Sequence, residues 1–148
     1  MKKINKTDGA KNTFKELDGE AIKKNGYLIF KNLFLVKFPK EFNIESTDVI
    51  SVEFIDNEIC RFIIKNNFIN FPLFSLNKYS KKCCSFFCRK NDSIVIDYLN
   101  RNGEKQYSAR LTKVRIRNIK EDILTYYNDE PHTITVDIKF SKRILEKQ

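Results

Sequence analysis

The feature that most constrains the fold is a strict alternation of apolar and polar residues near the end of the chain. In residues 133–140, TITVDIKF, every second position is apolar: Ile134, Val136, Ile138 and Phe140. Successive side chains of an extended chain point to opposite faces. The segment is therefore typical of an antiparallel strand that packs one face on a core and leaves the other in solvent.

Similar segments recur along the chain and predict a mainly β protein. Residues 27–38, YLIFKNLFLVKF, are rich in aromatic and branched side chains, and Pro39 should end this strand because it has no N–H for the ladder. Asn100–Gly103 contains residues that tolerate positive φ, which predicts a hairpin turn. The other predicted strands are Val49–Phe54, Arg61–Ile64, Ser93–Leu99 and Ser108–Arg117.

The middle of the chain has a different period. Leu73, Leu76, Tyr79 and Cys83 follow Pro72 at three- and four-residue spacing. Proline is favoured in the first turn of a helix, and this spacing places the four side chains on one helical face. We therefore predict one short helix here.

A chain of 148 residues is long enough for one hydrophobic core. Residues 27–148 are predicted to form that single β domain. Residues 1–26 are polar, and we expect an N-terminal arm with a short helical turn near Thr13–Leu17. Such an arm has too little apolar surface to offset the entropy of ordering it, so a partner subunit should order it.

The charge of the chain is high and unevenly distributed. The net charge is +9, which favours anionic partners. Residues 101–120 hold seven basic side chains and one acidic one, whereas residues 121–137 hold five acidic side chains and no lysine or arginine. Neighbouring blocks of opposite sign suit self-assembly as well as nucleic-acid binding. No run approaches the ~18 apolar residues of a membrane span, so no membrane partner is expected.

Cysteine and histidine do not form a convincing catalytic or metal site. Residues 1–26 lack the apolar core of a signal peptide, so a cytoplasm with reduced thiols is expected. A structural zinc site commonly uses two short-spaced pairs of ligands. The sequence has no CxxC, and its single histidine, His132, is remote from the thiols and is read as a structural or exposed turn residue. The cysteines are Cys60, Cys83, Cys84 and Cys88.

Three cations alternate with apolar residues near the end of the basic block. On a strand, Lys113, Arg115 and Arg117 would project from one face while Val114 and Ile116 enter the core. Such a stripe can bind phosphates, and a small basic nucleic-acid-binding β domain is one reading of the chain. The other is a solvated face or a subunit contact. Catalysis through a cysteine would need a base beside a low-pKa thiol, and the sequence offers none, so no enzyme is predicted.

Two stretches resemble the tail tube proteins of tailed phages, especially contractile-tailed ones, and their relatives in contractile injection systems. The first is NLFLVKFPKEFNIESTDVISVEF at residues 32–54. The second runs from Ser93 to Phe140, with a hairpin glycine at Gly103, an "I-x-x-x-x-L-x-Y" segment at 119–126 and an acidic turn at 128–130 before the final alternating strand. The middle of the chain, with its cysteines, matches no part of this pattern. The matching residues of the first stretch are Asn32, Phe34, Val36, Phe38, Pro39, Val49, Ser51 and Val52.

The resemblance implies a tail-tube-like fold, a twisted antiparallel β-sandwich or barrel with one short helix. It also implies a virion structural protein without cofactor or reaction, assembled in the host cytoplasm. Six copies would form a ring, and stacked rings, with other tail and baseplate proteins, would conduct DNA during ejection. The chain could belong to the main tube, a baseplate ring or a terminal ring.

Subunit contacts are expected in two places. The loop Lys40–Asp48 would contact a neighbouring ring, and the basic and acidic blocks would contact each other between subunits. The predicted interface residues are Lys40, Glu41, Phe42, Lys113, Arg115, Arg117, Glu121, Asp122, Asp129 and Glu130.

Overall fold

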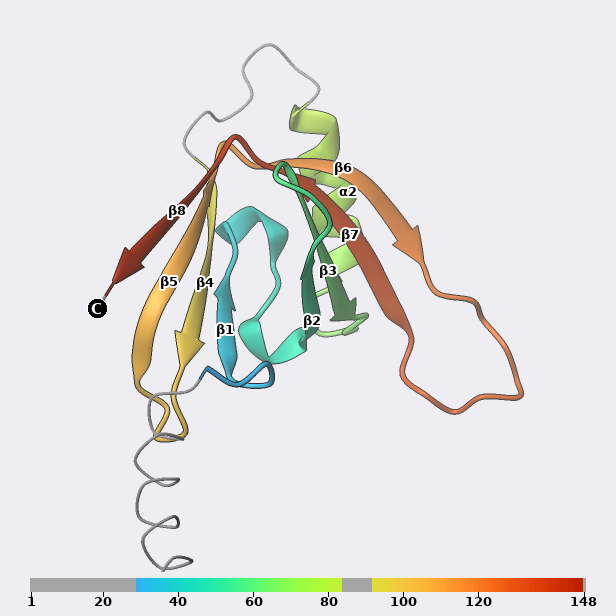
Figure 1. The fold of residues 1–148 in the computed structure, drawn as a ribbon. Coiled ribbons are helices and arrows are strands. Elements are labelled where there is room, and N and C mark those ends of the chain that lie inside the picture. Colours follow the sequence, from blue (N-terminus) through green and yellow to red (C-terminus); the bar gives the residue numbers. More distant parts are fainter. Residues whose placement is uncertain (1–28, 84–91, 148) are drawn as a thin grey trace, which may run out of the picture.

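The computed structural model describes residues 29–83 and 92–147, which form two four-stranded antiparallel sheets and one α-helix (Figure 1). The predicted mainly β architecture with antiparallel sheets and one short helix is confirmed in this part of the chain. Sheet A has the order β1 (Phe34–Lys37), β4 (Ser93–Leu99), β5 (Lys105–Thr112), β8 (Lys142–Lys147). Sheet B has the order β2 (Val49–Phe54), β3 (Ile59–Lys65), β7 (Thr133–Lys139), β6 (Arg115–Glu121).

The two sheets are joined at one side by a corner through which two chain segments pass. β5 leads into β6 and β7 leads into β8, so both segments leave one sheet and enter the other. The N–H of Ser141 donates to the carbonyl of Thr112 at 2.9 Å, which holds the two segments together at the corner. Lys113 makes the turn with a φ of 51°. The prediction of one strand over Ser108–Arg117 is therefore wrong, because the backbone turns at Lys113 between two strands of different sheets.

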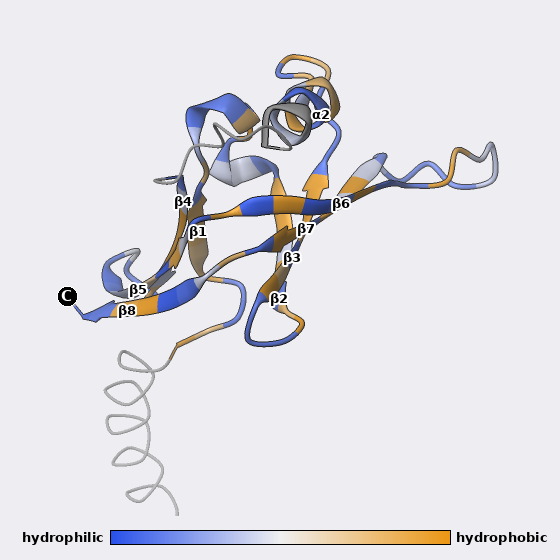
Figure 2. Cartoon of the chain, turned by 90° about the horizontal axis from the view of Figure 1, so that it is seen from above, coloured by the Kyte–Doolittle hydropathy of each residue, from blue (hydrophilic) through white to orange (hydrophobic). Residues whose placement is uncertain are grey.

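Among the residues that the structure describes, no strand pairing closes the opposite side of the sandwich. There the edge strand β1 of sheet A and the edge strand β2 of sheet B lie across from one another (Figure 2). Two 3-10 turns connect them, η1 (Lys40–Phe42) and η2 (Ser46–Asp48). The predicted open loop 40–48 is thus folded onto the domain, and Phe42 and Asp48 are buried.

The core lies between the sheets and continues beneath the helix α2 (Pro72–Cys83). The alternation that predicted β7 is seen directly, since Ile134, Val136 and Ile138 are buried and the residues between them are not. Leu76 and Tyr79 bring the buried face of α2 into the same cluster. The predicted helix is confirmed. Leu76 and Tyr79, which belong to the set of side chains at three- and four-residue spacing, lie on the face that the helix buries.

Two further predictions have clear outcomes. The Asn100–Gly103 turn joins β4 to β5, with Gly103 at φ 81° and its N–H donating to the Asn100 carbonyl at 3.0 Å. β8 was not predicted, because all six of its residues are exposed and its sequence KRILEK lacks a clean alternation. The predicted arm 1–26, with its helical turn near Thr13–Leu17, and the thiols Cys84 and Cys88 lie outside the described residues.

Candidate functional site

The β6–β7 loop, residues 122–132, is the most exposed apolar segment that the structure describes. Ile123 and Leu124 are 81% and 82% exposed, and Tyr126 and Tyr127 are fully exposed. Figure 1 shows this loop projecting beyond the ends of β6 and β7, away from both sheets. Large apolar patches on a protein surface commonly mark interaction sites. The loop therefore has the composition of a contact element and not of a solvated turn.

Hydrogen bonds fix the base of this loop to the domain. His132 Nε2 lies 3.1 Å from the Asp122 carbonyl oxygen, and His132 Nδ1 lies 3.1 Å from the Asn66 side-chain nitrogen. A neutral imidazole protonated on Nε2 fits both bonds. The N–H of Asp122 donates to the Thr133 carbonyl at 3.1 Å. His132 is thus a structural residue that sets where the loop leaves the sheet.

Within the loop, side chains replace the missing strand pairing. Asn128 Oδ1 accepts from the Glu130 N–H at 2.9 Å, and Thr125 Oγ1 accepts from the Tyr127 N–H at 3.2 Å. Short polar side chains commonly cap turns in this way. These bonds shape the loop without placing its four apolar side chains against the domain.

The predicted basic stripe lies at the outer edge of sheet B. Arg115 and Arg117 are exposed on β6, while Val114 is buried and Ile116 is half-buried, as the alternation predicted. The β6–β7 pairing shifts register between Ile116 and Asn118, so Arg117 sits at an irregular point of the strand. Lys113 is exposed at the corner, not on a strand.

The predicted acidic residues gather on the same element as the stripe. Glu121 ends β6, and Asp122, Asp129 and Glu130 belong to the β6–β7 loop, so one edge of the molecule changes from basic to acidic along its length. Lys40 lies in η1 beside α2.

Of the η1 residues, Phe42 must be removed from the predicted interface. It has no exposed surface, and its ring packs against Tyr79 with centroids 4.6 Å apart. Glu41 and Lys40 remain at the surface and line a shallow pocket of about 260 Å³ against α2.

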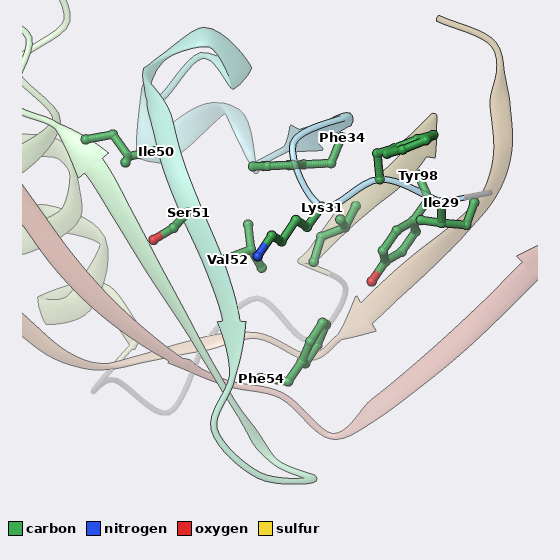
Figure 3. Close-up of a pocket in the computed structure, with 10 residues that line it drawn as sticks. Ile29, Lys31, Phe34, Ile50, Ser51, Val52, Phe54 and Tyr98 are labelled. Carbon is green, nitrogen blue, oxygen red and sulfur yellow. The ribbon is translucent and has the colours of Figure 1, made fainter. Parts of the chain in front are cut away.

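A larger groove of about 450 Å³ opens between β1 and β2, on the unclosed side of the sandwich. We call it the seam groove. Figure 3 shows Ser51, Val52 and Phe54 of β2 on one side and Phe34 of β1 and Tyr98 of β4 on the other. The full lining is Ile29, Phe30, Lys31, Phe34, Ile50, Ser51, Val52, Phe54, Ile96 and Tyr98.

Cations surround the seam groove. Lys31 is part of its lining. The guanidinium carbon of Arg101 lies 4.5 Å from the centroid of the Phe30 ring, and that of Arg143 lies 3.9 Å from the Phe54 centroid. Arg143 also donates to the Tyr98 hydroxyl at 3.4 Å, and burial raises the pKa of that hydroxyl. The groove is therefore lined mainly by apolar side chains, with Lys31 among them, and two arginines flank it.

The thiol of Cys60 lies in the core, not at either surface. Burial raises its pKa to about 12, so the nucleophilic thiolate is suppressed at neutral pH. In the described part of the chain, no cluster of three metal-ligating side chains occurs, and no helix is long and apolar enough to cross a membrane.

The sandwich can be compared with known proteins. No family model matches the sequence, and no curated protein matches it significantly. The fold, however, matches a chain of the sheath–tube complex of PVC, an extracellular contractile injection system, with a TM-score of 0.64, 11% identity and coverage of 82% of this chain and 93% of the other. The chain has the fold of a tail tube protein.

Two other solved structures support the same tail-tube fold. A chain from the tube-terminating cap of the anti-feeding prophage gives a TM-score of 0.61 at 11% identity, covering 82% of this chain and 93% of that one. Hcp1 from Flavobacterium johnsoniae gives a TM-score of 0.55 at 11% identity, and the match covers 78% of this chain and 96% of that one. The resemblance expected from residues 32–54 and 93–140 is confirmed at the level of fold.

Within this tail-tube fold, the sequence located the charged edge but missed the seam groove. The groove is lined by residues from three separate segments, around β1, β2 and β4, and no local sequence pattern indicates such a set. The apolar character of the β6–β7 loop did have a signal, since Ile123, Leu124, Tyr126 and Tyr127 cluster inside an otherwise acidic stretch. The sequence assigns Leu124 and Tyr126 to the "I-x-x-x-x-L-x-Y" segment and residues 128–130 to an acidic turn, but it does not predict that these apolar side chains are exposed.

Proposed function

We propose that this chain is a structural subunit of a tail-type tube, in which copies form rings, six to a ring, and the rings stack into a hollow conduit. The observation that carries the proposal is the fold, which matches chains of injection-system tubes over nearly their whole length. The function is mechanical, and we propose no reaction for it.

The open sheet edges support ring formation. In the described residues, β1, β8, β2 and β6 each pair on one side only. An unpaired edge presents a row of N–H and C=O groups that can pair with another chain. Closing the edges across subunits into one barrel would satisfy these groups. β8 is the strongest candidate, because its six residues are exposed and include Ile144 and Leu145.

The charged edge suits contacts between copies. We propose that Arg115 and Arg117 on β6, with Lys113 at the corner, face acidic residues of a neighbouring subunit. Glu121, Asp122, Asp129 and Glu130 supply negative charge for contacts between copies. Lys40 and Glu41 of η1 would contact an adjacent ring.

We further propose that the tube is that of a phage virion and conducts DNA during ejection, with other tail or baseplate proteins at its ends. Residues 1–26 would act as an arm that orders on assembly, and residues 27–148 would be the tube domain. Main tube, baseplate ring and terminal ring all fit this proposal.

The test is negative-stain electron microscopy of purified, nucleic-acid-free protein over a range of concentrations. Rings or tubes with a central pore are expected. The double charge reversal Arg115→Glu with Arg117→Glu should impair assembly and leave the folded monomer intact by circular dichroism. Lys65→Glu, at an exposed position on the inner strand β3, is the control and should assemble normally. Unimpaired assembly of the double variant would remove the stripe from the interface.

A second function is a small nucleic-acid-binding domain. The net charge of +9 and the exposed Arg115 and Arg117 favour it. Phosphate binding releases counterions, so affinity for DNA should fall steeply with salt. A protein that stays monomeric at every concentration and loses DNA affinity steeply between low and moderate salt would favour this function over a tube.

A further inference from the structure

Within the described residues, the apolar side chains of the β6–β7 loop have no cover. Ile123, Leu124, Tyr126 and Tyr127 follow β6, whereas the seam groove is bounded by β2. β6 and β2 are the two opposite edges of sheet B. Figures 1 and 2 both show the loop on the far side of sheet B from sheet A. The loop therefore cannot reach the groove of its own molecule.

The groove has the complementary shape and chemistry. It is the unclosed side of the sandwich, and several of its lining side chains remain partly exposed, among them Ile29 and Ile50 at 41% and 46%. A concave apolar site of this volume suits a few large side chains. Aromatic residues are the side chains that most often anchor protein–protein contacts in such pockets.

The charges around the two surfaces are also complementary. Asp122, Asp129 and Glu130 give the loop a net negative charge, and it contains no lysine or arginine. Lys31, Arg101 and Arg143 line or flank the groove. Charge pairs of this kind at the rim of a contact favour one partner and orientation over others.

We propose that the β6–β7 loop of one copy inserts its apolar side chains into the seam groove of the next copy and so closes the open side of that sandwich. The two surfaces differ and lie at opposite edges of sheet B, so the contact is head-to-tail. Head-to-tail contacts generate rings when the rotation closes and helical filaments when it does not. The inference names a contact for the proposed tube assembly and rests on that function only in assigning the contact to a tube.

Photo-crosslinking tests this contact directly. A benzophenone analogue of phenylalanine replaces Tyr126 in one full-length variant and Ile50 in another. Both positions are exposed, so neither change should unfold the domain. After irradiation, mass spectrometry should place the crosslinks of position 126 in residues 29–34 and 50–54 of a second copy. The crosslinks of position 50 should fall in residues 122–132 of a second copy.

Two controls make the result specific. The same analogue at Phe68, which is 78% exposed but lies outside the loop, should give no crosslink to the groove. Ile50→Glu, combined with the probe at position 126, should lower the crosslink yield roughly tenfold, because it places a carboxylate where an acidic loop must dock.

The outcomes separate this inference from the proposed function. Rings or tubes whose position-126 crosslinks fall outside the groove would overturn the inference and leave the tube function standing. Crosslinks into the groove in small oligomers, without rings or tubes, would support the contact and count against the tube. Crosslinks from position 50 to residues 1–28 would show that the N-terminal segment fills the groove, and absence of intermolecular crosslinks would likewise overturn the proposal.

Discussion

The central strands and the β6–β7 loop use the same kinds of side chain in opposite ways. Phe62, Ile64 and Ile138 of β3 and β7 have no exposed surface, whereas Ile123 and Tyr127 of the loop are almost wholly exposed. The first set is buried by the chain itself and stabilises the monomer. The second can contribute only when another surface covers it. The comparison separates residues that fold the subunit from residues that would join subunits.

The difference extends to the way each region is held. Every residue of β3 pairs with β7, from Ile59 opposite Lys139 to Lys65 opposite Thr133. The loop is fixed only at its base, by Asp122, His132 and Thr133. A strand of the first kind resists local opening, while a segment of the second kind can adjust to a partner.

The largest effect should follow from a cavity in the central strands. Phe62→Ala removes a fully buried ring that packs edge-on against the ring of Phe38, with the two ring centroids 5.1 Å apart. It should lower the free energy of unfolding by about 3–5 kcal/mol, measured by urea denaturation. Phe68→Ala, at an exposed position, is the matched control and should change little. A small effect of Phe62→Ala would mean that the core does not carry the stability of the subunit.

The buried thiol of Cys60 should make the stability of the core, though not that of the β6–β7 loop, depend on alkaline pH. The pKa of Cys60 rises from 9.0 to about 12 on folding, because burial disfavours the thiolate. The folded state therefore keeps a proton that the unfolded state loses above pH 9. Stability from this group is complete below pH 9 and falls as the pH rises toward 12, by at most ~1.4 kcal/mol per pH unit.

Denaturation curves at pH 8 and pH 10 test this dependence. Cys60→Ala should be less stable at pH 8, because it leaves a cavity, and should lose less stability than the unmodified protein on going to pH 10. Burial is the main cause of the raised pKa of Tyr98, and that cause is present in both proteins. Equal losses in the two proteins would show that the thiol already ionises in the fold.

A smaller effect is expected at the β4–β5 turn, a connection that needs no partner. Gly103 has a φ of 81°, and a Cβ there would meet no atom within 4 Å. Gly103→Ala should therefore cost only the backbone strain, about 1–2 kcal/mol. Thermal unfolding measures this loss of stability, and Asn102→Ala is the neighbouring substitution for comparison. A loss much larger than this would indicate that the turn contributes packing that the structure does not show.

Much of the fold could be predicted because alternation is a local signal. β3, β4 and β7 are half-buried strands, and their periods were visible in the sequence. The corner at Lys113 could not be predicted, because the alternation of cations and apolar residues continues across the turn. The turn is seen only in the backbone conformation. β8 was not predicted, because an exposed edge strand has no buried face and therefore needs no alternation of apolar and polar residues.

The candidate site was predicted in part, for the same physical reason. Arg115 and Arg117 lie on one strand, so their shared exposure follows from period two. The seam groove depends on β1 and β2 meeting across the sandwich, which no local spacing records. Phe42 was assigned to a surface because its neighbours are polar, but η1 turns its ring inward against Tyr79. Tertiary packing, not local sequence, decides such positions.

The smallest effect on the monomer should come from the loop. Tyr126→Ala with Tyr127→Ala removes two fully exposed rings, so the free energy of unfolding should change by less than about 0.5 kcal/mol. If the loop joins subunits, the same variant should lose most of its self-association in sedimentation velocity runs at matched concentrations. The alanine variant of Phe68 should associate as the unmodified protein does. A marked loss of monomer stability would place the two tyrosines in the subunit's own core and erase the distinction between the two regions. Normal association with normal stability would leave the exposed rings without a role between subunits.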